Sequence, residues 1–177
     1  NGLAPDEAFI AVETVGIDTA AKVSAVLHAG LGERATPPEL LGAMVEWKRF
    51  GKKNGAGFYG EPPVTELIAA KFPLARQVEI APADGFRRMM VGLVNESFAL
   101  LDEGIASEDD IETACIFGIG FPMALSGPLH WAENQGLATI VTELETLEKK
   151  YCVRFTPSRL LREYAGQKKP LFANSVW

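Results

Sequence analysis

The chain has 177 residues, of which 47% are hydrophobic and 23% are charged, and its net charge is −6. This composition is ordinary for a soluble globular protein, and the length is sufficient to bury a core. The acidic balance argues against nonspecific nucleic-acid binding, which needs a basic surface. No apolar run reaches the roughly 18 residues of a membrane span.

The first part of the chain is predicted to be helical, because apolar residues recur with the period of an α-helix and alternating β-branched runs are absent. An amphipathic helix over Thr19–Leu27 is expected to bury Val23, Val26 and Leu27. Glycines that follow this segment supply its end.

A second helix start is predicted at Thr36 and Pro37. Threonine is a favourable N-cap, and proline at the first helical position loses nothing by lacking an N–H. The residues expected on the buried side of this helix are Leu40, Leu41, Met44, Val45 and Trp47. A polar, glycine-rich loop over residues 51–57 follows.

Prolines interrupt the segment over residues 61–83. They leave room for at most one short helix, Val64–Phe72. The longest predicted helix, Asp84–Leu101, follows this segment. We therefore predict a truncated first helical repeat over residues 1–60, a linker over residues 61–83 and a second helical repeat over residues 84–177.

The remaining predicted helices have short connections. Ser107 is expected to cap one of them, with Asp110 completing a capping box. The later helices are expected over Leu129–Asn134, over Leu137–Tyr151, and from Thr156 and Pro157 to Gly166. The predicted fold class is all-α.

A segment of the chain occurs twice, at a constant spacing of 120 residues. The matching pairs are Phe9 and Leu129, Glu13 and Glu133, Gly16 and Gly136, Ile17 and Leu137, Thr19 and Thr139, Thr36 and Thr156, Pro37 and Pro157, Leu40 and Leu160, and Leu41 and Leu161. One fixed offset over so long a stretch indicates a duplicated helical unit.

The two copies differ in what precedes them. The second copy has a long helical stretch beginning at Asp84 ahead of Leu129, whereas the first has only residues 1–8 ahead of Phe9. The chain also begins with Asn1 rather than Met. We therefore expect a chain cut inside its first repeat.

Two segments resemble the C-terminal helical domain of 3-hydroxyacyl-CoA dehydrogenases, namely VGIDTAAKV and PPELLGAMVEWKRFGKKNGAGFYG. A third is similar to the second copy of that domain in multifunctional fatty-acid β-oxidation proteins, namely LVNESFALLDEGIASEDDIETACIFGIGFPMALSGPLHWAENQG. The resemblance covers nearly the whole chain. It departs from the family at Glu7-Ala8, where Gly-Pro is usual, and over Met123–Ser126, which is usually richer in glycine and proline.

The resemblance implies an oxidoreductase in which a separate dinucleotide-binding domain binds NAD and carries a catalytic His–Glu pair. No G-x-G-x-x-G motif follows a predicted strand in this chain, and no parallel-sheet pattern occurs. We therefore expect no catalytic and no cofactor-binding residue here, with NAD held by the other domain of a parent enzyme.

Three residues are candidates for substrate binding. Lys52 and Lys53 lie in the glycine-rich loop, where lysines and backbone N–H groups favour an anion such as a CoA phosphate. The alternative is a solvated loop that positions Phe58 and Tyr59. Asn95 is the second-copy counterpart of the family's substrate-contacting asparagine. Its alternative role is to cap a neighbouring backbone, because buried polar groups need partners.

Other polar residues have structural explanations. His28 and His130 have no further ligand at metal-binding spacing, so no metal site is expected. The acidic run Glu108–Asp110 stands at a helix start, where negative charge offsets the helix dipole.

The leading functional hypothesis is the C-terminal portion of an NAD-dependent 3-hydroxyacyl-CoA dehydrogenase of fatty-acid β-oxidation, which supports the acyl-CoA cleft and domain pairing and is not catalytic alone. The alternatives are a noncatalytic dimerisation or assembly module, with apolar surface near Val23, Val26 and Leu27, and an acyl-CoA-binding module that uses the Lys52–Lys53 loop.

The expected partners are the parent's dinucleotide-binding domain, acyl-CoA and a second copy in a homo-oligomer. The expected location is the cytoplasm, or a mitochondrial or peroxisomal matrix in a eukaryote.

Overall fold

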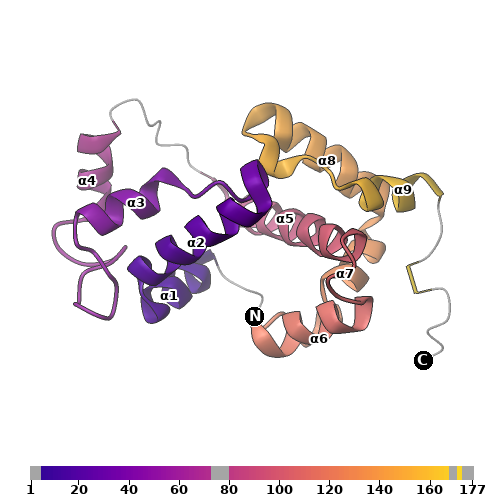
Figure 1. Cartoon of the computed structure of the whole chain (residues 1–177), viewed down its shortest axis with the longest axis horizontal. Helices are drawn as coiled ribbons and strands as arrows, with labels where there is room; N and C mark the ends of the chain where they lie inside the picture. Colours follow the sequence, from indigo (N-terminus) through magenta and orange to yellow (C-terminus); the bar gives the residue numbers. More distant parts are fainter. Residues whose placement is uncertain (1–4, 73–79, 168–170, 173–177) are drawn as a thin grey trace. The chain divides into compact units, whose positions relative to one another are not determined.

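A computed structural model describes residues 5–72, 80–167 and 171–172, with side chains from residue 9 onward (Figure 1). Within these residues every regular element is a helix, and one isolated β-bridge joins Gly51 to Ala56. The predicted all-α class is confirmed.

The helices of the first repeat are α1 (Pro5–Val15), α2 (Ile17–Leu31), the 3-10 helix η1 (Gly32–Ala35) and α3 (Glu39–Glu46), and α4 (Val64–Lys71) follows. The later part contains α5 (Pro82–Asp102), α6 (Glu108–Gly118), η2 (Met123–Leu125), α7 (Pro128–Gln135), α8 (Leu137–Lys150), η3 (Val153–Phe155) and α9 (Arg159–Gln167). Ser107 and Asp110 form the predicted capping box at the start of α6, with each side chain bonded to the other residue's backbone N–H.

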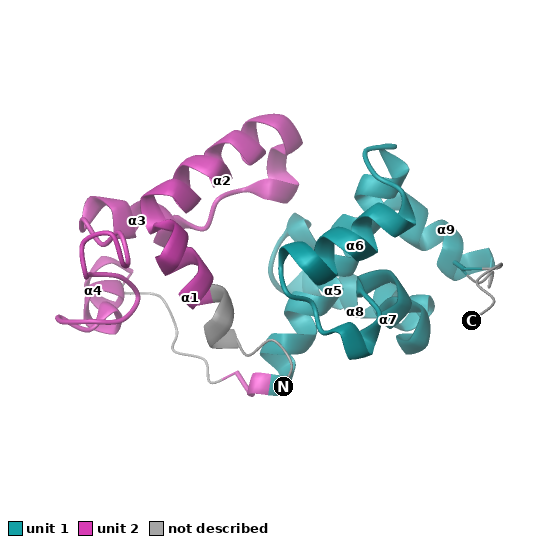
Figure 2. Cartoon of the chain, turned by 90° about the horizontal axis from the view of Figure 1, so that it is seen from below, with its two compact units in different colours: residues 1–3, 83–177 teal, residues 4–82 magenta. Residues whose placement is uncertain are grey.

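The chain divides into two compact units, coloured separately in Figure 2. Residues 4–82, with α1 to α4, are named here the N-terminal unit. Residues 83–177, with almost all of α5 and the helices that follow, are the main part of the C-terminal unit.

The repeat is present in the backbone as well as in the sequence. At an offset of 120 residues, α2 and α8 begin at Ile17 and Leu137, η1 and η3 end at Ala35 and Phe155, and α3 and α9 begin at Glu39 and Arg159. Gly16 and Gly136 each separate two helices, with φ of 108° and 86°. A side chain is strained at such angles, which explains why both copies have glycine there.

The predicted helix starts at Thr36–Pro37 and at Thr156–Pro157 are both wrong, because α3 begins at Glu39 and α9 at Arg159. Thr36 follows the end of η1, and α3 begins at Glu39 after Pro38, whose backbone is extended. In the first repeat a steric restraint contributes, because a residue that precedes a proline is disfavoured in the α region, and Pro37 does not open a helix ahead of Pro38. The second repeat has Ser158 in place of Pro38 and starts its helix at the equivalent residue, so Pro38 alone does not set the start.

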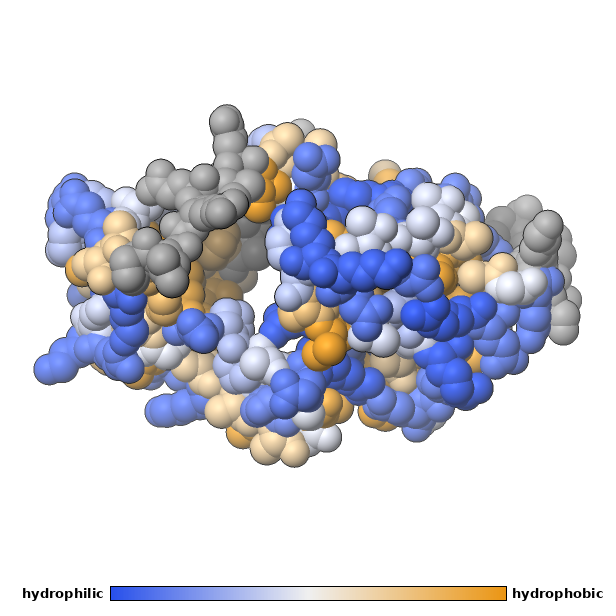
Figure 3. Space-filling model, turned by 90° about the horizontal axis from the view of Figure 1, so that it is seen from above, coloured by the Kyte–Doolittle hydropathy of each residue, from blue (hydrophilic) through white to orange (hydrophobic). Residues whose placement is uncertain are grey.

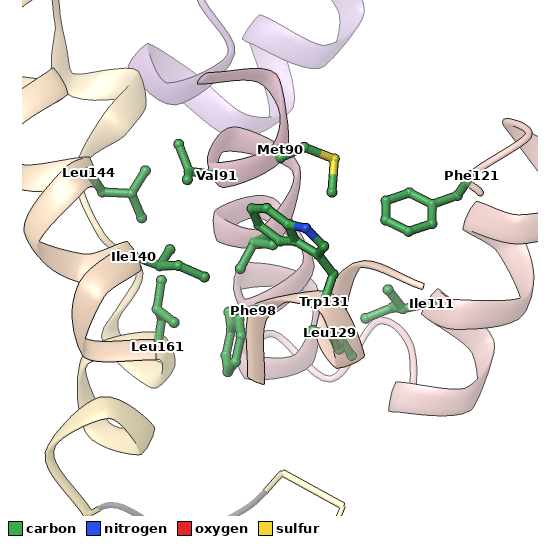
Figure 4. Packing of buried hydrophobic residues seen from close by; sticks show 12 residues of the cluster. Met90, Val91, Phe98, Ile111, Phe121, Leu129, Trp131, Ile140, Leu144 and Leu161 are labelled. Atoms are coloured by element: carbon green, nitrogen blue, oxygen red, sulfur yellow. The ribbon is translucent and has the colours of Figure 1, made fainter. Parts of the chain in front are cut away.

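The C-terminal unit has a continuous apolar core around α5. Its buried members are Met90, Val91, Val94, Phe98, Ile111, Phe121, Leu129, Trp131, Ala132, Ile140, Leu144 and Leu161. Figure 4 shows α5 between two groups of these side chains, with Leu144 and Ile140 of α8 on one side and Phe121 and Ile111 on the other. Full burial of one large apolar side chain stabilises a fold by roughly 1.5–3 kcal/mol.

The N-terminal unit buries fewer large side chains. Ile17, Ala43 and Met44 are its buried apolar residues among those described. The prediction that α2 buries Val23, Val26 and Leu27 is wrong, because these side chains are 51%, 73% and 48% exposed. Helices α1 and α3 contact α2, yet these three side chains stay exposed. The helical period thus identified an apolar face correctly, but it could not show whether this unit covers that face.

Apolar residues are accordingly visible among polar ones on the surface drawn in Figure 3. The exposed large apolar side chains of α2 are Val23, Val26 and Leu27.

Candidate functional site

The glycine-rich loop after α3 packs against the end of α1. The N–H of Gly51 donates to the Ala56 carbonyl at 2.7 Å, and the N–H of Lys52 donates to the Glu13 carbonyl at 3.0 Å. Gly51 has a φ of 79°, and a Cβ atom there would lie 2.5 Å from the Glu13 carbonyl oxygen. Glycine is therefore required both for the backbone angle and for the close approach.

Arg49 holds the far side of the same loop. Its guanidinium is buried and donates to the carbonyls of Gly57 at 2.6 Å and Pro62 at 3.0 Å. Sequence reasoning missed this residue, since its neighbour Lys48 has the same charge and is exposed. A single sequence gives no signal that separates the two.

A glutamate of each repeat binds the segment that follows the repeat's last helix. Glu13 Oε1 accepts the N–H of Tyr59 at 3.2 Å, and Glu133 Oε1 accepts the N–H of Leu171 at 2.8 Å. Glu13 and Glu133 are 120 residues apart, so the repeat was the available signal for this shared role.

The two candidate lysines have different surroundings. Lys53 Nζ donates to Asp18 Oδ1 at 2.8 Å and to Thr19 Oγ1 at 2.7 Å. The hydrogen bond from Lys53 lowers the pKa of Asp18 below its ordinary value. The positive charge of Lys53 is therefore balanced locally. Lys52 is exposed, and within the part of the chain that the structure describes its ammonium has no partner.

Asn95 lies on α5 and is bonded to the chain ahead of α9. Its Nδ2 donates to the Thr156 carbonyl at 2.9 Å, and its Oδ1 accepts the N–H of Ser158 at 2.8 Å. Its side chain is buried and both ends of its amide are engaged. Asn95 belongs to the C-terminal unit, whereas Lys52 and Lys53 belong to the N-terminal unit.

Glu112 and His130 form a carboxylate–imidazole pair that sequence reasoning did not identify. Glu112 Oε1 accepts the N–H of Leu129 at 3.0 Å, the N–H of His130 at 2.9 Å and lies 3.1 Å from His130 Nδ1. Burial raises the pKa of Glu112, although the hydrogen bonds from α7 oppose that rise. The side chain lies against Gly127, where any Cβ atom would overlap it.

This carboxylate has a structural role. It satisfies N–H groups in the first turn of α7, which have no acceptor within the helix. The imidazole of His130 is held in turn by stacking on Phe172, with ring centroids 3.8 Å apart.

Residues 55–60 have the spacing of a dinucleotide-binding loop, Gly-x-Gly-x-x-Gly. That function requires a strand before the loop and free space at the central glycine. No strand occurs in the described residues, and the carboxylate of Glu13 occupies the space beside Gly57. The loop does not fit NAD.

The described residues contain no group of three or more His, Cys, Asp or Glu side chains placed to hold a metal ion. Among the helices of those residues, none combines the length and apolar character needed to cross a membrane.

The fold and these contacts define a duplicated helical domain. Its buried polar side chains among the described residues, Arg49, Asn95, Ser97 and Glu112, all bond to its own backbone. The family model for the C-terminal domain of 3-hydroxyacyl-CoA dehydrogenase matches residues 5–61 and again residues 86–170. The chain belongs to this family, with one match in each repeat.

Relatives are fatty acid oxidation complex subunits alpha. Those of Shewanella oneidensis and Shewanella amazonensis are 34% and 36% identical to the chain, each over 91% of it. The chain spans 24% of the length of each of these relatives. The crystal structure of 3-hydroxybutyryl-CoA dehydrogenase from Escherichia coli K12 has the same fold, with a TM-score of 0.69 and 20% identity over 90% of this chain and 51% of that one.

Proposed function

We propose that the chain is the two-repeat helical portion of an NAD-dependent 3-hydroxyacyl-CoA dehydrogenase of fatty-acid β-oxidation. The observation that carries the proposal is the match of one family model to both repeats. In this role the chain supports the acyl-CoA cleft and pairs domains, while a separate dinucleotide-binding domain holds NAD and the catalytic groups. The expected location is the cytoplasm, or an organelle matrix in a eukaryote.

A domain exchange tests this role. The corresponding quarter of the Shewanella oneidensis subunit is replaced by this chain, and reduction of acetoacetyl-CoA by NADH is measured. We expect turnover from the chimera and none from the chain alone. A folded but inactive chimera would contradict the support role, and turnover by the chain alone would contradict the assignment of the redox groups to another domain.

Lys52 is the stronger of the two lysine candidates for a CoA phosphate, because Lys53 is already paired with Asp18. An exposed ion pair contributes at most about 1 kcal/mol, so Lys52→Ala should weaken CoA binding by no more than roughly fivefold. Calorimetric titration with CoA measures this, and Lys149→Ala is the control at another exposed lysine. Equal affinities for all three proteins would exclude Lys52. Substrate contacts by Lys53 and Asn95 stay predictions.

The exposed apolar side chains of α2 favour a second candidate function, that of an assembly module. Sedimentation velocity tests the assembly module. Self-association through the exposed side chains of α2 would make the sedimentation coefficient rise with protein concentration, whereas a chain that only supports a parent enzyme would show no such dependence.

A further inference from the structure

Two cations lie against one aromatic ring at the end of α8. The guanidinium carbon of Arg88, on α5, is 4.3 Å from the centroid of the Tyr151 ring, and Arg88 Nη2 donates to the Tyr151 hydroxyl oxygen at 3.0 Å. Lys150 Nζ is 5.2 Å from the same centroid. Arg88, Lys150 and Tyr151 are named here the Tyr151 cluster.

The Tyr151 cluster contains hydrogen-bond donors and positive charge but no carboxylate. Within the described part of the chain, neither Arg88 nor Lys150 forms an ion pair. Glu148, close to Lys150 in sequence, accepts the Thr156 hydroxyl at 2.5 Å instead. The Tyr151 hydroxyl accepts from Arg88 and still has its own proton to donate. Guanidinium, ammonium and hydroxyl donors are thus available together for an acceptor that the described residues do not supply.

A structural role accounts for only part of this arrangement. A lysine in the last turn of a helix offsets the helix dipole, and an arginine stacked on tyrosine ties α5 to the end of α8. The equivalent helix of the first repeat, α2, ends with Gly30 and Leu31 where the second repeat has Lys150 and Tyr151. The end of this helix therefore forms without such a cluster.

We propose that the Tyr151 cluster binds a phosphate monoester. The charge of such a group is about −1.5 to −2 at neutral pH, which matches two unpaired cations, whereas a carboxylate has a single charge. Its oxygens can accept from the guanidinium, the ammonium and the hydroxyl at once, and guanidinium geometry suits phosphate.

The contact with Tyr151 also holds the Arg88 guanidinium in place before a ligand arrives. A donor that is already ordered loses less conformational freedom on binding. The Tyr151 cluster lies in the C-terminal unit, apart from Lys52 and Lys53 of the N-terminal unit. The inference does not depend on the activity of a parent enzyme.

An NMR titration of the full chain with inorganic phosphate tests the proposal. Amide spectra are recorded at constant ionic strength and at about pH 7.5, where phosphate has most of its second charge. We expect phosphate to shift the signals of residues 150–152 with a dissociation constant of roughly 1–10 mM, as a few exposed ionic contacts allow. Acetate, titrated in the same way, should bind at least about fivefold more weakly, because it has half the charge.

Variants of the Tyr151 cluster connect this binding to its donors. Arg88→Gln should weaken phosphate binding about tenfold or more, and Lys150→Ala about three- to fivefold. Tyr151→Phe keeps the ring under Arg88 but removes the hydroxyl, and it should weaken binding about threefold. Lys22→Ala, at an exposed lysine of α2, is the control and should leave the dissociation constant unchanged.

Vesicle sedimentation distinguishes two sources of the phosphate group. Phosphatidylcholine vesicles that contain phosphatidate present a phosphate monoester on a lipid surface. Binding to these vesicles that Arg88→Gln abolishes would assign the site to a lipid head group, and binding of free phosphate alone would assign it to a soluble phosphate ester. The inference is overturned if neither probe binds, if acetate binds as tightly as phosphate, or if the three cluster variants bind phosphate as Lys22→Ala does.

Discussion

Glu112 links the pH of the solution to the stability of the C-terminal unit. Its carboxyl is largely buried, and Oε2 has no hydrogen-bond partner among the described residues. Burial raises its pKa in the folded state, so folding favours the protonated form. This contribution to stability is complete below the unfolded pKa of about 4.3, and it is lost as pH rises through the higher folded pKa.

Glu112→Gln should therefore change the pH profile of stability. The variant keeps an acceptor for the N–H groups of Leu129 and His130 but has no charge to bury. We expect the free energy of unfolding of the unaltered protein, minus that of the variant, to fall from pH 4 to pH 8. Urea unfolding at several pH values measures the difference. Glu66→Gln, at an exposed site on α4, is the control; a Glu112→Gln difference as flat as that control would contradict the prediction.

Gly51 offers a second test at single-residue scale. Gly51→Ala should cost about 2–4 kcal/mol, because it adds overlap with the Glu13 carbonyl to the strain of a positive φ. Gly55→Ala shares the positive φ but meets no atom within 4 Å, so it should cost only about 1 kcal/mol. Urea unfolding of the two variants gives their losses of unfolding free energy. Equal losses would show that the overlap with the Glu13 carbonyl contributes nothing to the cost of Gly51→Ala.

At the scale of helices, Asn95 connects α5 to the segment that begins α9. Asn95→Ala leaves the Thr156 carbonyl and the Ser158 N–H without partners and should cost about 2–3 kcal/mol. Ser97→Ala is the control, because Ser97 is as buried on the same helix but bonds only to Leu93 of its own helix, and it should cost less than about 1 kcal/mol.

Hydrogen exchange adds a local measurement to this comparison. Faster exchange at the first amides of α9 is expected in Asn95→Ala and not in Ser97→Ala. Unchanged exchange in α9 would show that Asn95 does not fix the start of that helix.

The sequence predicts where helices occur better than it predicts which elements pack against them. Helix α5 was expected over residues 84–101 and is found over Pro82–Asp102, since apolar period and proline position are local properties. Helices α3 and α9 begin at Glu39 and Arg159, two residues beyond the prolines at which the sequence predicts their starts, and in the first repeat Pro38 disfavours a helical Pro37. The face of α2 was expected to be buried because a periodic pattern does not identify the element that covers it.

The polar contacts of the candidate site also divide into those that the sequence could predict and those that it could not. Glu13 and Glu133 could be noticed because the repeat preserves both. Arg49 and Glu112 could not, since their partners are backbone groups several residues away that no side-chain pattern reveals. Tertiary hydrogen bonds to backbone are invisible in one sequence, whatever their contribution to the fold.

At the scale of the whole chain, the two repeats share a backbone plan but differ in buried apolar surface. Twelve buried side chains form the core of the C-terminal unit, whereas Ile17, Ala43 and Met44 are the buried apolar side chains described in the N-terminal unit. Hydrophobic stabilisation scales with apolar area removed from water. The N-terminal unit should therefore be the less stable of the two.

We expect the N-terminal unit to unfold at a lower urea concentration than the C-terminal unit. Met44→Ala and Leu144→Ala each remove a fully buried side chain, one from each unit, and such changes cost about 2–5 kcal/mol. Met44→Ala should lower only the first transition and Leu144→Ala only the second, because mutations without shared partners act independently. Hydrogen exchange followed by mass spectrometry along a urea series resolves the helices of each unit. A single transition that both variants shift equally would show that the two repeats unfold as one cooperative body, whatever the difference between their cores.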